Sequence, residues 1–213
     1  MPLAERTAYI ITHYAPKEIL SGYNNISGDI YAVDEGLQMV DALGLKPCYI
    51  IGDFDSVNQG LLSQYQATPI IRHETKKDET DTELALQFCV ASGKYQKIVI
   101  CNDMQGRFDH ALAIVQNLCW LHGLGLDACI ENAMQRIFFL QNHSLLQVPE
   151  GTLLSLIPWS DEACFEYSVG LAYSLDNLKI YRHQSRGISN VCIANEVEIA
   201  LESGLVLAIL SYP

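Results

Sequence analysis

The first two thirds of the chain alternate between short apolar, β-branched runs and stretches whose apolar residues recur with a helical period. The apolar runs predict buried strands at residues 8–12, 30–33, 49–51, 69–71 and 97–101. Helical patterns lie between and after them, at residues 36–43, 57–64, 81–92 and 109–122. This alternation predicts an α/β domain with a mostly parallel, doubly wound sheet and helices on both faces.

The helix predicted at residues 81–92 has the clearest start signal. Thr80 can cap it, and Glu83 three residues later completes a T-x-x-E capping box. Leu84 and Phe88 then repeat at the i, i+4 spacing that places side chains on one buried face.

After about residue 140 the helical patterns stop and short strand-like pieces follow. They lie at residues 145–148, 153–157, 164–168, 178–182, 197–201 and 205–210, with turn residues between them. Short strands at this spacing predict a C-terminal antiparallel β-sandwich. We place the boundary near Asn142, with an α/β domain at residues 1–141 and a β-sandwich domain at residues 142–213.

Composition narrows the classes of function. The formal net charge of the 213 residues is -12, which argues against nucleic acid as a partner, because a phosphate backbone is bound by a basic surface. No signal-type segment or run of ~18 apolar residues is present, so we expect a soluble, cytoplasmic protein without membrane contact. The seven cysteines include no C-x-x-C pair, which favours reduced thiols over a zinc site.

Three acidic runs carry the candidate chemistry, at residues 52–56, 77–83 and 106–110. Each falls where a predicted strand gives way to a loop or a helix. Ligands of open α/β sheets bind outside the carboxyl ends of the strands, so the three runs should converge on one site. Carboxylates together with an arginine and a few lysines suit a magnesium-bound polyphosphate. The sequence has no P-loop and no G-x-G-x-x-G fingerprint.

Asp53 and Asp55 follow the predicted strand at residues 49–51. On an extended backbone, residues two apart point to the same side, so both carboxylates can face one cation. The alternative is an acidic turn in which Asp55 and Ser56 cap the next helix.

Asp81 stands at the start of a predicted helix, where the helix dipole alone would favour a negative charge. Lys76 and Lys77 are a solvated pair in the simpler reading. They become phosphate ligands if their loop lies at the same edge of the sheet.

In the third run Gly106 allows close approach to a ligand, and Arg107 offers a planar fork of donors suited to phosphate. Asp109 can cap a helix that begins at His110, so a structural role explains these two residues as well as a catalytic one does.

With these motifs in hand, the chain resembles the thiamine pyrophosphokinase (thiamine diphosphokinase) family from about residue 30 to residue 210. The family's A-D-G-G, G-D-F-D-S, K-D-x-T-D-x-E-x-A-L and G-G-R-x-D-H motifs correspond to residues 33–36, 52–56, 77–86 and 105–110. Its S-L-I-P strand, T-x-G-L-x-Y-x-L stretch, G-x-S-N turn and closing strand correspond to residues 155–158, 168–175, 187–190 and 203–207.

The resemblance implies an α/β domain, a C-terminal β-sandwich and a homodimer. ATP and Mg²⁺ would bind the first domain, and thiamine a cleft completed by the second domain of the partner. The implied metal-binding and catalytic carboxylates are Asp53, Asp55 and Asp81, with Arg107 as a catalytic, phosphate-binding residue. The implied ATP-binding residues are Asp34, Lys77, Asp78, Arg107, Asp109 and His110. The implied thiamine-binding residues are Ser189 and Asn190.

The chain departs from the family pattern in the loops around both ligands. Glu35, Asn102 and Gln105 replace glycines, Val191 replaces an acid, and Ile114 replaces an asparagine. Asn102 can preserve a turn, because asparagine tolerates the left-handed conformation.

The implied activity is that of a thiamine diphosphokinase, which transfers diphosphate from ATP to the hydroxyl of thiamine and yields thiamine diphosphate and AMP. One alternative is a diphosphokinase of the same fold that acts on another hydroxymethyl compound, such as a pterin. Another is a non-catalytic relative that binds thiamine or a nucleotide. Comparing acceptors separates the first two, and tight binding without release of AMP identifies the third.

Overall fold

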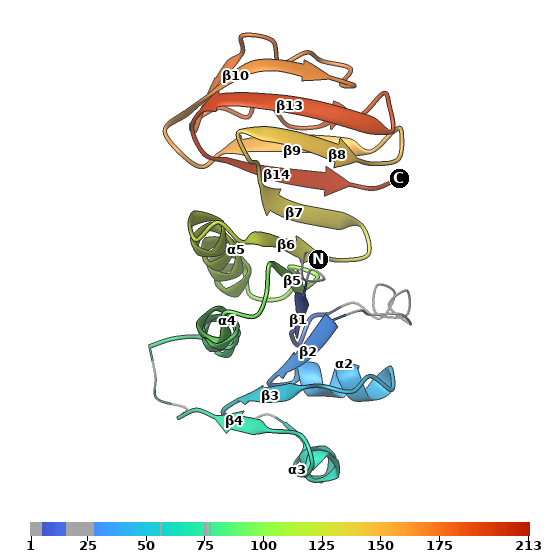
Figure 1. Ribbon diagram of the computed structural model, residues 1–213, viewed down its shortest axis with the longest axis vertical. Helices are drawn as coiled ribbons and strands as arrows, with labels where there is room; N and C mark the ends of the chain where they lie inside the picture. The colour runs from blue at the N-terminus through green and yellow to red at the C-terminus, as the bar shows by residue number, and fades with distance from the viewer. Residues whose placement is uncertain (1–5, 16–27, 56, 75, 77) are drawn as a thin grey trace, which may run out of the picture. The chain divides into compact units, whose positions relative to one another are not determined.

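A computed structural model of the chain describes residues 6–15, 28–55, 57–74, 76 and 78–213 (Figure 1). Its internal contacts divide the chain into two units, Met1–Ala133 and Met134–Pro213. We describe each unit by itself.

The first unit is built on a parallel sheet with strand order β6-β5-β1-β2-β3-β4. Its strands are β1 (Thr7–Ile11), β2 (Gly28–Val33), β3 (Tyr49–Gly52), β4 (Ile70–Arg72), β5 (Lys97–Cys101) and β6 (Asp127–Glu131). The middle strands are buried almost throughout, as expected for a sheet covered on both faces. The predicted fold class is confirmed for this unit.

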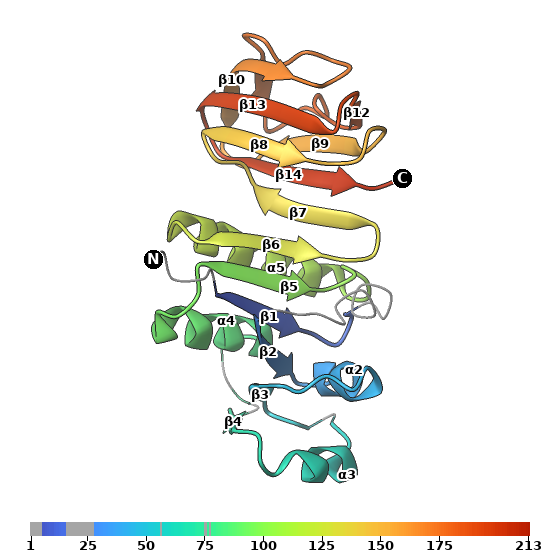
Figure 2. The same ribbon diagram turned by 45° about the vertical axis from the view of Figure 1, so that its right-hand side comes forward.

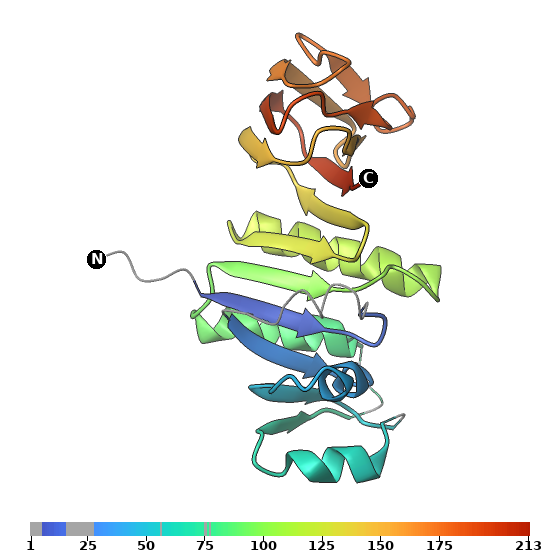
Figure 3. The same ribbon diagram turned by 90° about the vertical axis from the view of Figure 1, so that its right-hand side faces the viewer.

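Helices cover both faces of this sheet: α2 (Gly36–Ala42), α3 (Gln59–Leu62), α4 (Asp81–Ser92) and α5 (Phe108–Gly123). Figures 2 and 3 show α4 and α5 on one face and α2 on the other. Parallel strands need such crossover connections, and these set the carboxyl ends of the strands along one edge of the sheet. None of the helices within the described residues is long and apolar enough to cross a membrane.

Helix α4 has the predicted bounds. The Thr80 hydroxyl accepts a hydrogen bond from the Glu83 backbone N–H at 3.2 Å, and Gly93 ends the helix with a φ of 61°. The reciprocal half of the predicted capping box is absent, because the Glu83 carboxylate accepts a hydrogen bond from Gln87 instead. The threonine therefore caps this helix alone.

Two other helix starts differ from the prediction. Helix α5 begins at Phe108, with Arg107 at the N-cap position and no side-chain cap, so Asp109 lies in the first turn and does not cap the helix. Helix α3 is capped by Asn58, whose side chain accepts from two backbone N–H groups. Asp55 is therefore not its cap, and Ser56 lies outside the described residues.

The second unit is a β-sandwich, as predicted. One sheet has the order β12-β9-β14-β7 and the other β11-β10-β13-β8, with antiparallel pairing throughout. The strands are β7 (Gln135–Phe139), β8 (His143–Gln147), β9 (Leu153–Pro158), β10 (Glu162–Val169), β11 (Lys179–Tyr181), β12 (Asn190–Val191), β13 (Glu196–Ser203) and β14 (Val206–Ser211). Leu156 and Ala208 from one sheet share a buried core with Phe165 and Ile199 from the other.

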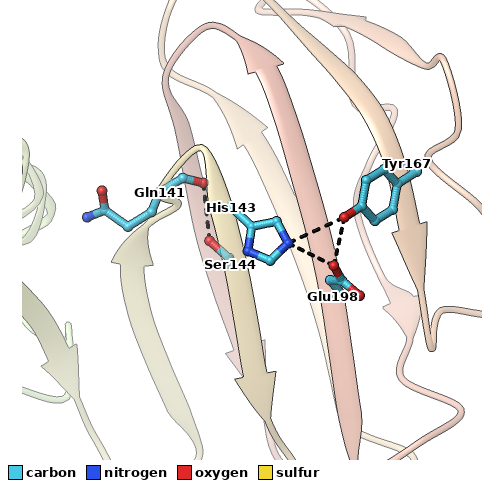
Figure 4. A network of polar contacts seen from close by, with 5 residues as sticks. All are labelled: Gln141, His143, Ser144, Tyr167 and Glu198. Atoms are coloured by element: carbon cyan, nitrogen blue, oxygen red, sulfur yellow. Dashed lines mark hydrogen bonds and ion pairs between the residues drawn. The ribbon is translucent and has the colours of Figure 1, made fainter.

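A polar network joins three neighbouring strands on the exposed face of the second sheet (Figure 4). Glu198 on β13 accepts a hydrogen bond from Tyr167 on β10 and contacts His143 Nε2 on β8, each at 2.7 Å. These partners lower the pKa of Glu198, the Tyr167 hydrogen bond first. Such cross-strand contacts stabilise the register of a sheet modestly.

Three strands were missed by the sequence analysis: β6, β7 and β12. Strand β6 begins four residues after α5 ends, and β12 has only two residues. The two residues of β12 carry no periodic pattern. Strands β6 and β7 contain short apolar runs, at residues 128–130 and 137–139, that were not assigned to predicted strands. The seven cysteines are free thiols.

Candidate functional site

A cavity of about 440 Å³ lies in the first unit. Its walls come from the exits of β1, β2, β3 and β5 and from the starts of α4 and α5. Five of its lining residues belong to the set named from the sequence: Asp34, Asp53, Asp78, Asp81 and His110. The structure thus brings residues of all three acidic runs to one place.

Asp34 is the cavity carboxylate whose pKa is shifted most from its ordinary value. Its Oδ1 atom is buried and has no hydrogen-bond partner. Burial and then the neighbouring charges of Asp81 and Asp53 raise the pKa of Asp34 to about 6. The backbone N–H of Glu35 opposes this shift. These carboxylates are therefore close enough to repel one another, an arrangement that a bound cation relieves.

Asp53 and Asp55 do not lie on an extended backbone, so the expectation of parallel side chains was wrong. Phe54 between them adopts a φ of 62° and buries its ring to 2% exposure. The Asp55 N–H donates to Asp53 Oδ1 at 3.1 Å and closes a tight turn. Asp53 lines the cavity, whereas Asp55 is exposed and lies outside its lining.

The loop before α4 contributes Asp78, Glu79 and Thr80 to the cavity wall, and Asp81 opens the helix. Lys77 lies outside the described residues. Within the described parts of the chain, no three Asp, Glu, His or Cys side chains are grouped closely enough to hold a metal ion by themselves.

Arg107 and Asp109 form an exposed bidentate pair instead of lining the cavity. Arg107 Nη2 and Nε donate to the two Asp109 carboxylate oxygens at 2.6 and 3.1 Å. The Arg107 hydrogen bond lowers the pKa of Asp109, and Asp109 also accepts from the His110 N–H at 3.0 Å. Because α5 starts one residue after Arg107, the Arg107 guanidinium and the Asp109 carboxylate lie side by side at the start of the helix.

Three cavity residues that the motifs did not indicate, Thr12, His13 and Tyr14, lie on the loop after β1. His13 Nδ1 is 3.0 Å from the Glu35 carboxylate, and the Tyr14 ring packs on Gly106. Glu35, which departs from the family pattern, is therefore paired with a cationic partner when His13 is protonated. The rule that ligands bind at strand exits would have found this loop if it had been applied to the first strand.

Asn102 joins the exits of β1 and β5. It is 4% exposed; its Nδ2 donates to Thr12 Oγ1 at 2.8 Å, and its Oδ1 accepts from the Met104 N–H at 2.6 Å. Met104 has a φ of 57°, so the left-handed turn falls there and not at Asn102 itself. The Asn102 side chain stabilises the loop that leads to Arg107.

A second cavity, of about 460 Å³, lies in the second unit. Its lining includes Tyr173, Arg186, Ile188 and Asn190. The two residues named for thiamine differ here: Asn190 is buried, whereas Ser189 is exposed, with a φ of 59°.

Comparison with known proteins identifies the family. The model of the catalytic domain of thiamin pyrophosphokinase matches residues 23–130, which are 108 of the 213 residues. The chain belongs to the thiamin pyrophosphokinase family. The matched stretch contains every carboxylate of the first cavity, and the second cavity lies beyond it.

Individual members of the thiamin pyrophosphokinase family match more of the chain. It is 26% identical over 204 residues to the thiamine pyrophosphokinase of Bacillus subtilis (strain 168), covering 90% of this chain and 91% of the relative. It is 23% identical over 180 residues to Thiamin pyrophosphokinase 1 of Caenorhabditis elegans, covering 76% and 70%.

Solved structures of thiamin pyrophosphokinases share the fold. The crystal structure of the Bacillus subtilis thiamine pyrophosphokinase has a TM-score of 0.86 at 24% identity, covering 97% of this chain and 99% of that one. The thiamin pyrophosphokinase of Candida albicans has a TM-score of 0.82 at 15% identity, covering 98% and 90%. The likeness therefore includes both the α/β part and the β-sandwich.

Proposed function

We propose that this protein is a thiamine diphosphokinase that transfers diphosphate from ATP to the primary hydroxyl of thiamine and releases AMP. The observation that supports it best is the cavity in which carboxylates from the exits of β2 and β3 and from the start of α4 meet, inside the stretch matched by the catalytic-domain model. The names of its relatives supply the acceptor, thiamine.

A divalent cation fits the first cavity. The buried Asp34 oxygen lacks a partner, and Asp53 and Asp81 crowd it with negative charge. Magnesium binds through only one or two protein carboxylates and completes its shell with water and phosphate oxygens, so a closed cage of ligands is not needed. We propose Asp53, Asp55 and Asp81 as the carboxylates that would hold the ion, one or two of them directly and the rest through its water shell; the bound ion would neutralise charge on the phosphates.

The residues of the chain act by binding and orientation. We assign ATP to Asp34, Lys77, Asp78, Arg107, Asp109 and His110. The Arg107 fork would exchange its Asp109 carboxylate for a phosphate and stabilise charge on the transferred group. The thiamine hydroxyl oxygen attacks the β-phosphorus and loses its proton to a carboxylate of the site or to water; the bond from that phosphorus to the bridging oxygen of the α-phosphate breaks, and AMP leaves. Such catalysis needs no protein nucleophile.

Thiamine binds to the second cavity; Asn190 lines it, and Ser189 lies between two lining residues, Ile188 and Asn190. We further propose a homodimer, which sedimentation at several protein concentrations would test. The free thiols fit a cytoplasmic location, where cysteines stay reduced.

Product analysis tests this function. The purified protein is incubated with Mg-ATP, with and without thiamine, and the nucleotide and thiamine products are separated. We expect thiamine-dependent AMP and an equal amount of thiamine diphosphate, and far less of both from Asp81→Asn. ADP with thiamine monophosphate would contradict diphosphate transfer. AMP formed with a pterin but not with thiamine would replace the acceptor, and tight binding without turnover would indicate a binding protein.

A further inference from the structure

A short ladder of backbone hydrogen bonds borders the second cavity. It joins residues 170–173 to residues 190–193, around an antiparallel bridge between Leu171 and Cys192. The Ala172 N–H donates to the Val191 carbonyl and the Ile193 N–H to the Gly170 carbonyl, each at 2.9 Å. The next residue pair along this antiparallel ladder is Tyr173 with Asn190.

The side chain of Asn190 supplies this next pair. Its Oδ1 accepts from the Tyr173 N–H at 3.0 Å, and its Nδ2 donates to the Tyr173 carbonyl at 2.7 Å. A primary amide has the donor and acceptor of a peptide group, so the side chain takes the place of a strand neighbour. Asn190 is 6% exposed, and this contact fixes the backbone of Tyr173 from both sides.

Asn190 keeps only one Nδ2 hydrogen with which it could bind a ligand. Its Oδ1 also accepts from the Val191 N–H at 2.9 Å, so both lone pairs of this oxygen are used. Ser189 is the opposite case: it is exposed, and its hydroxyl contacts no other described residue. Its backbone N–H donates to Ser155 Oγ at 3.1 Å, which holds the turn in place.

Tyr173 is the residue that the Asn190 amide orients. Its side chain lines the second cavity together with Ile188 and is 71% exposed. An exposed aromatic ring on a fixed backbone presents a flat face to a ligand, and the face of a tyrosine attracts cations and heteroaromatic rings.

We propose that Asn190 is a positioning residue that shapes the acceptor site through Tyr173 and does not itself touch the acceptor. Tyr173 and the Ser189 hydroxyl make the contacts with an aromatic, cationic acceptor. This proposal rests on the proposed function, because it identifies how the same acceptor is held.

A double-mutant cycle tests this division of roles. Asn190→Ala, Tyr173→Ala and the double variant are compared with the wild-type protein by the KM for thiamine, the KM for ATP and kcat. Tyr173→Ala should raise the KM for thiamine by about three- to tenfold, the size of effect that one aromatic contact contributes. Asn190→Ala should raise it by no more than that, and the double variant should match Tyr173→Ala alone, because coupled residues are not additive. The KM for ATP should not change.

Independent effects would overturn the proposal. If the KM of the double variant rises by the product of the two single effects, Asn190 contacts the acceptor directly. If Asn190→Ala lowers kcat and leaves the KM for thiamine unchanged, its role is only structural. If Tyr173→Ala leaves this KM unchanged, Tyr173 is not the contact.

Asn195→Ala is the matched control, because Asn195 also accepts a backbone N–H through its amide, at 3.1 Å, but lies outside the cavity lining. It should leave every constant unchanged. If Asn190→Ala does not fold, Asn190→Ser replaces it in the cycle, since serine adds no charge and its single hydroxyl cannot pair with both the N–H and the carbonyl of Tyr173. The wild-type protein separates the two claims: absence of thiamine turnover contradicts the proposed function, whereas an additive cycle in an active enzyme contradicts only the positioning role.

Discussion

At the scale of single residues, the buried charge of Asp34 destabilises the folded protein when no ligand is bound. Its pKa of about 6, raised first by burial, lies above the ordinary value of 3.8. Between these two values the folded protein binds more protons than the unfolded chain, so stability falls as the pH rises through this window. Above about pH 6 the full cost of the buried charge remains.

Asp34→Asn should therefore stabilise the ligand-free protein while it lowers turnover. Above about pH 7 we expect a gain of about 1–2 kcal/mol in the free energy of unfolding, discounted because solvent reaches this half-buried group. Thermal unfolding in EDTA across the pH range measures it, with Asp161→Asn as an exposed control. This gain in the free energy of unfolding should vanish below about pH 4. Added Mg²⁺ should make the gain smaller, because the ion stabilises the wild-type protein more than it stabilises Asp34→Asn. A gain that does not depend on pH would contradict this reading.

The carboxylates assigned to magnesium should be needed for turnover and not for folding. Asp53→Asn, Asp55→Asn and Asp81→Asn should each lower kcat by about a hundredfold or more, because each removes a negative charge that would hold the ion against the phosphates. Steady-state AMP release measures this, and circular dichroism checks the fold. Unimpaired turnover of Asp55→Asn, the one of the three outside the cavity lining, would remove Asp55 from the ion site.

The residues that the sequence indicated well are those placed by the exits of predicted strands. Asp53 follows β3 and Asp81 starts α4, and both reach one cavity because parallel strands end at a common edge, whereas Asp34 was implied only by the family resemblance. The pairing of Arg107 with Asp109 was not predictable, since it depends on the residue at which α5 starts. His13 and Tyr14 were missed because their loop carries no motif.

At the scale of elements, the loops after β1 and β5 act as one wall of the first cavity. The Asp103 N–H donates to the Tyr14 carbonyl at 2.8 Å, and Asn102 binds Thr12. Gly106, with a φ of 78°, lies directly against the Tyr14 ring. A side chain at residue 106 would therefore push the two loops apart.

Gly106→Ala tests this contact. A Cβ atom there would come within 2.6 Å of Tyr14 Cζ, in addition to the strain of a positive φ. Gly151→Ala is the control, because Gly151 has a φ of 89° and open space around its Cα. Both variants should lose about 1–2 kcal/mol of stability from backbone strain, and only Gly106→Ala should also raise the KM for ATP. Adding Tyr14→Ala should restore part of that loss; equal behaviour of the two glycine variants would contradict the contact.

Helix α4 depends on its cap for the placement of Asp81. Thr80→Ala should lower the free energy of unfolding by about 1 kcal/mol, because one backbone N–H of the first turn loses its acceptor. Thr80→Ser keeps the hydroxyl and should restore it. Denaturant unfolding of the three proteins measures the difference, and a serine variant as unstable as the alanine variant would show that the hydroxyl is not the cap.

Most elements were predictable because they bury a regular apolar pattern. Helix α4 has its predicted bounds, and the fold class follows from the alternation of strands and helices. Strand β12 was not predictable, because two residues carry no periodicity and its pairing with β9 depends on the rest of the sandwich.

At the scale of the whole molecule, an acidic protein has to bind an acidic donor. The net charge of -12 and the carboxylates of the first cavity both repel free ATP. We therefore expect ATP to bind as its magnesium complex. A cationic acceptor such as thiamine is attracted by the same negative field. The chain belongs to the thiamin pyrophosphokinase family.

The most direct test follows the phosphorus atoms of ATP. The protein is supplied with Mg²⁺, thiamine and ATP labelled at the α-phosphorus in one reaction and at the γ-phosphorus in another. Diphosphate transfer predicts that the α label appears only in AMP and the γ label only in thiamine diphosphate. The γ label in thiamine monophosphate, with the α label in ADP, would contradict the account.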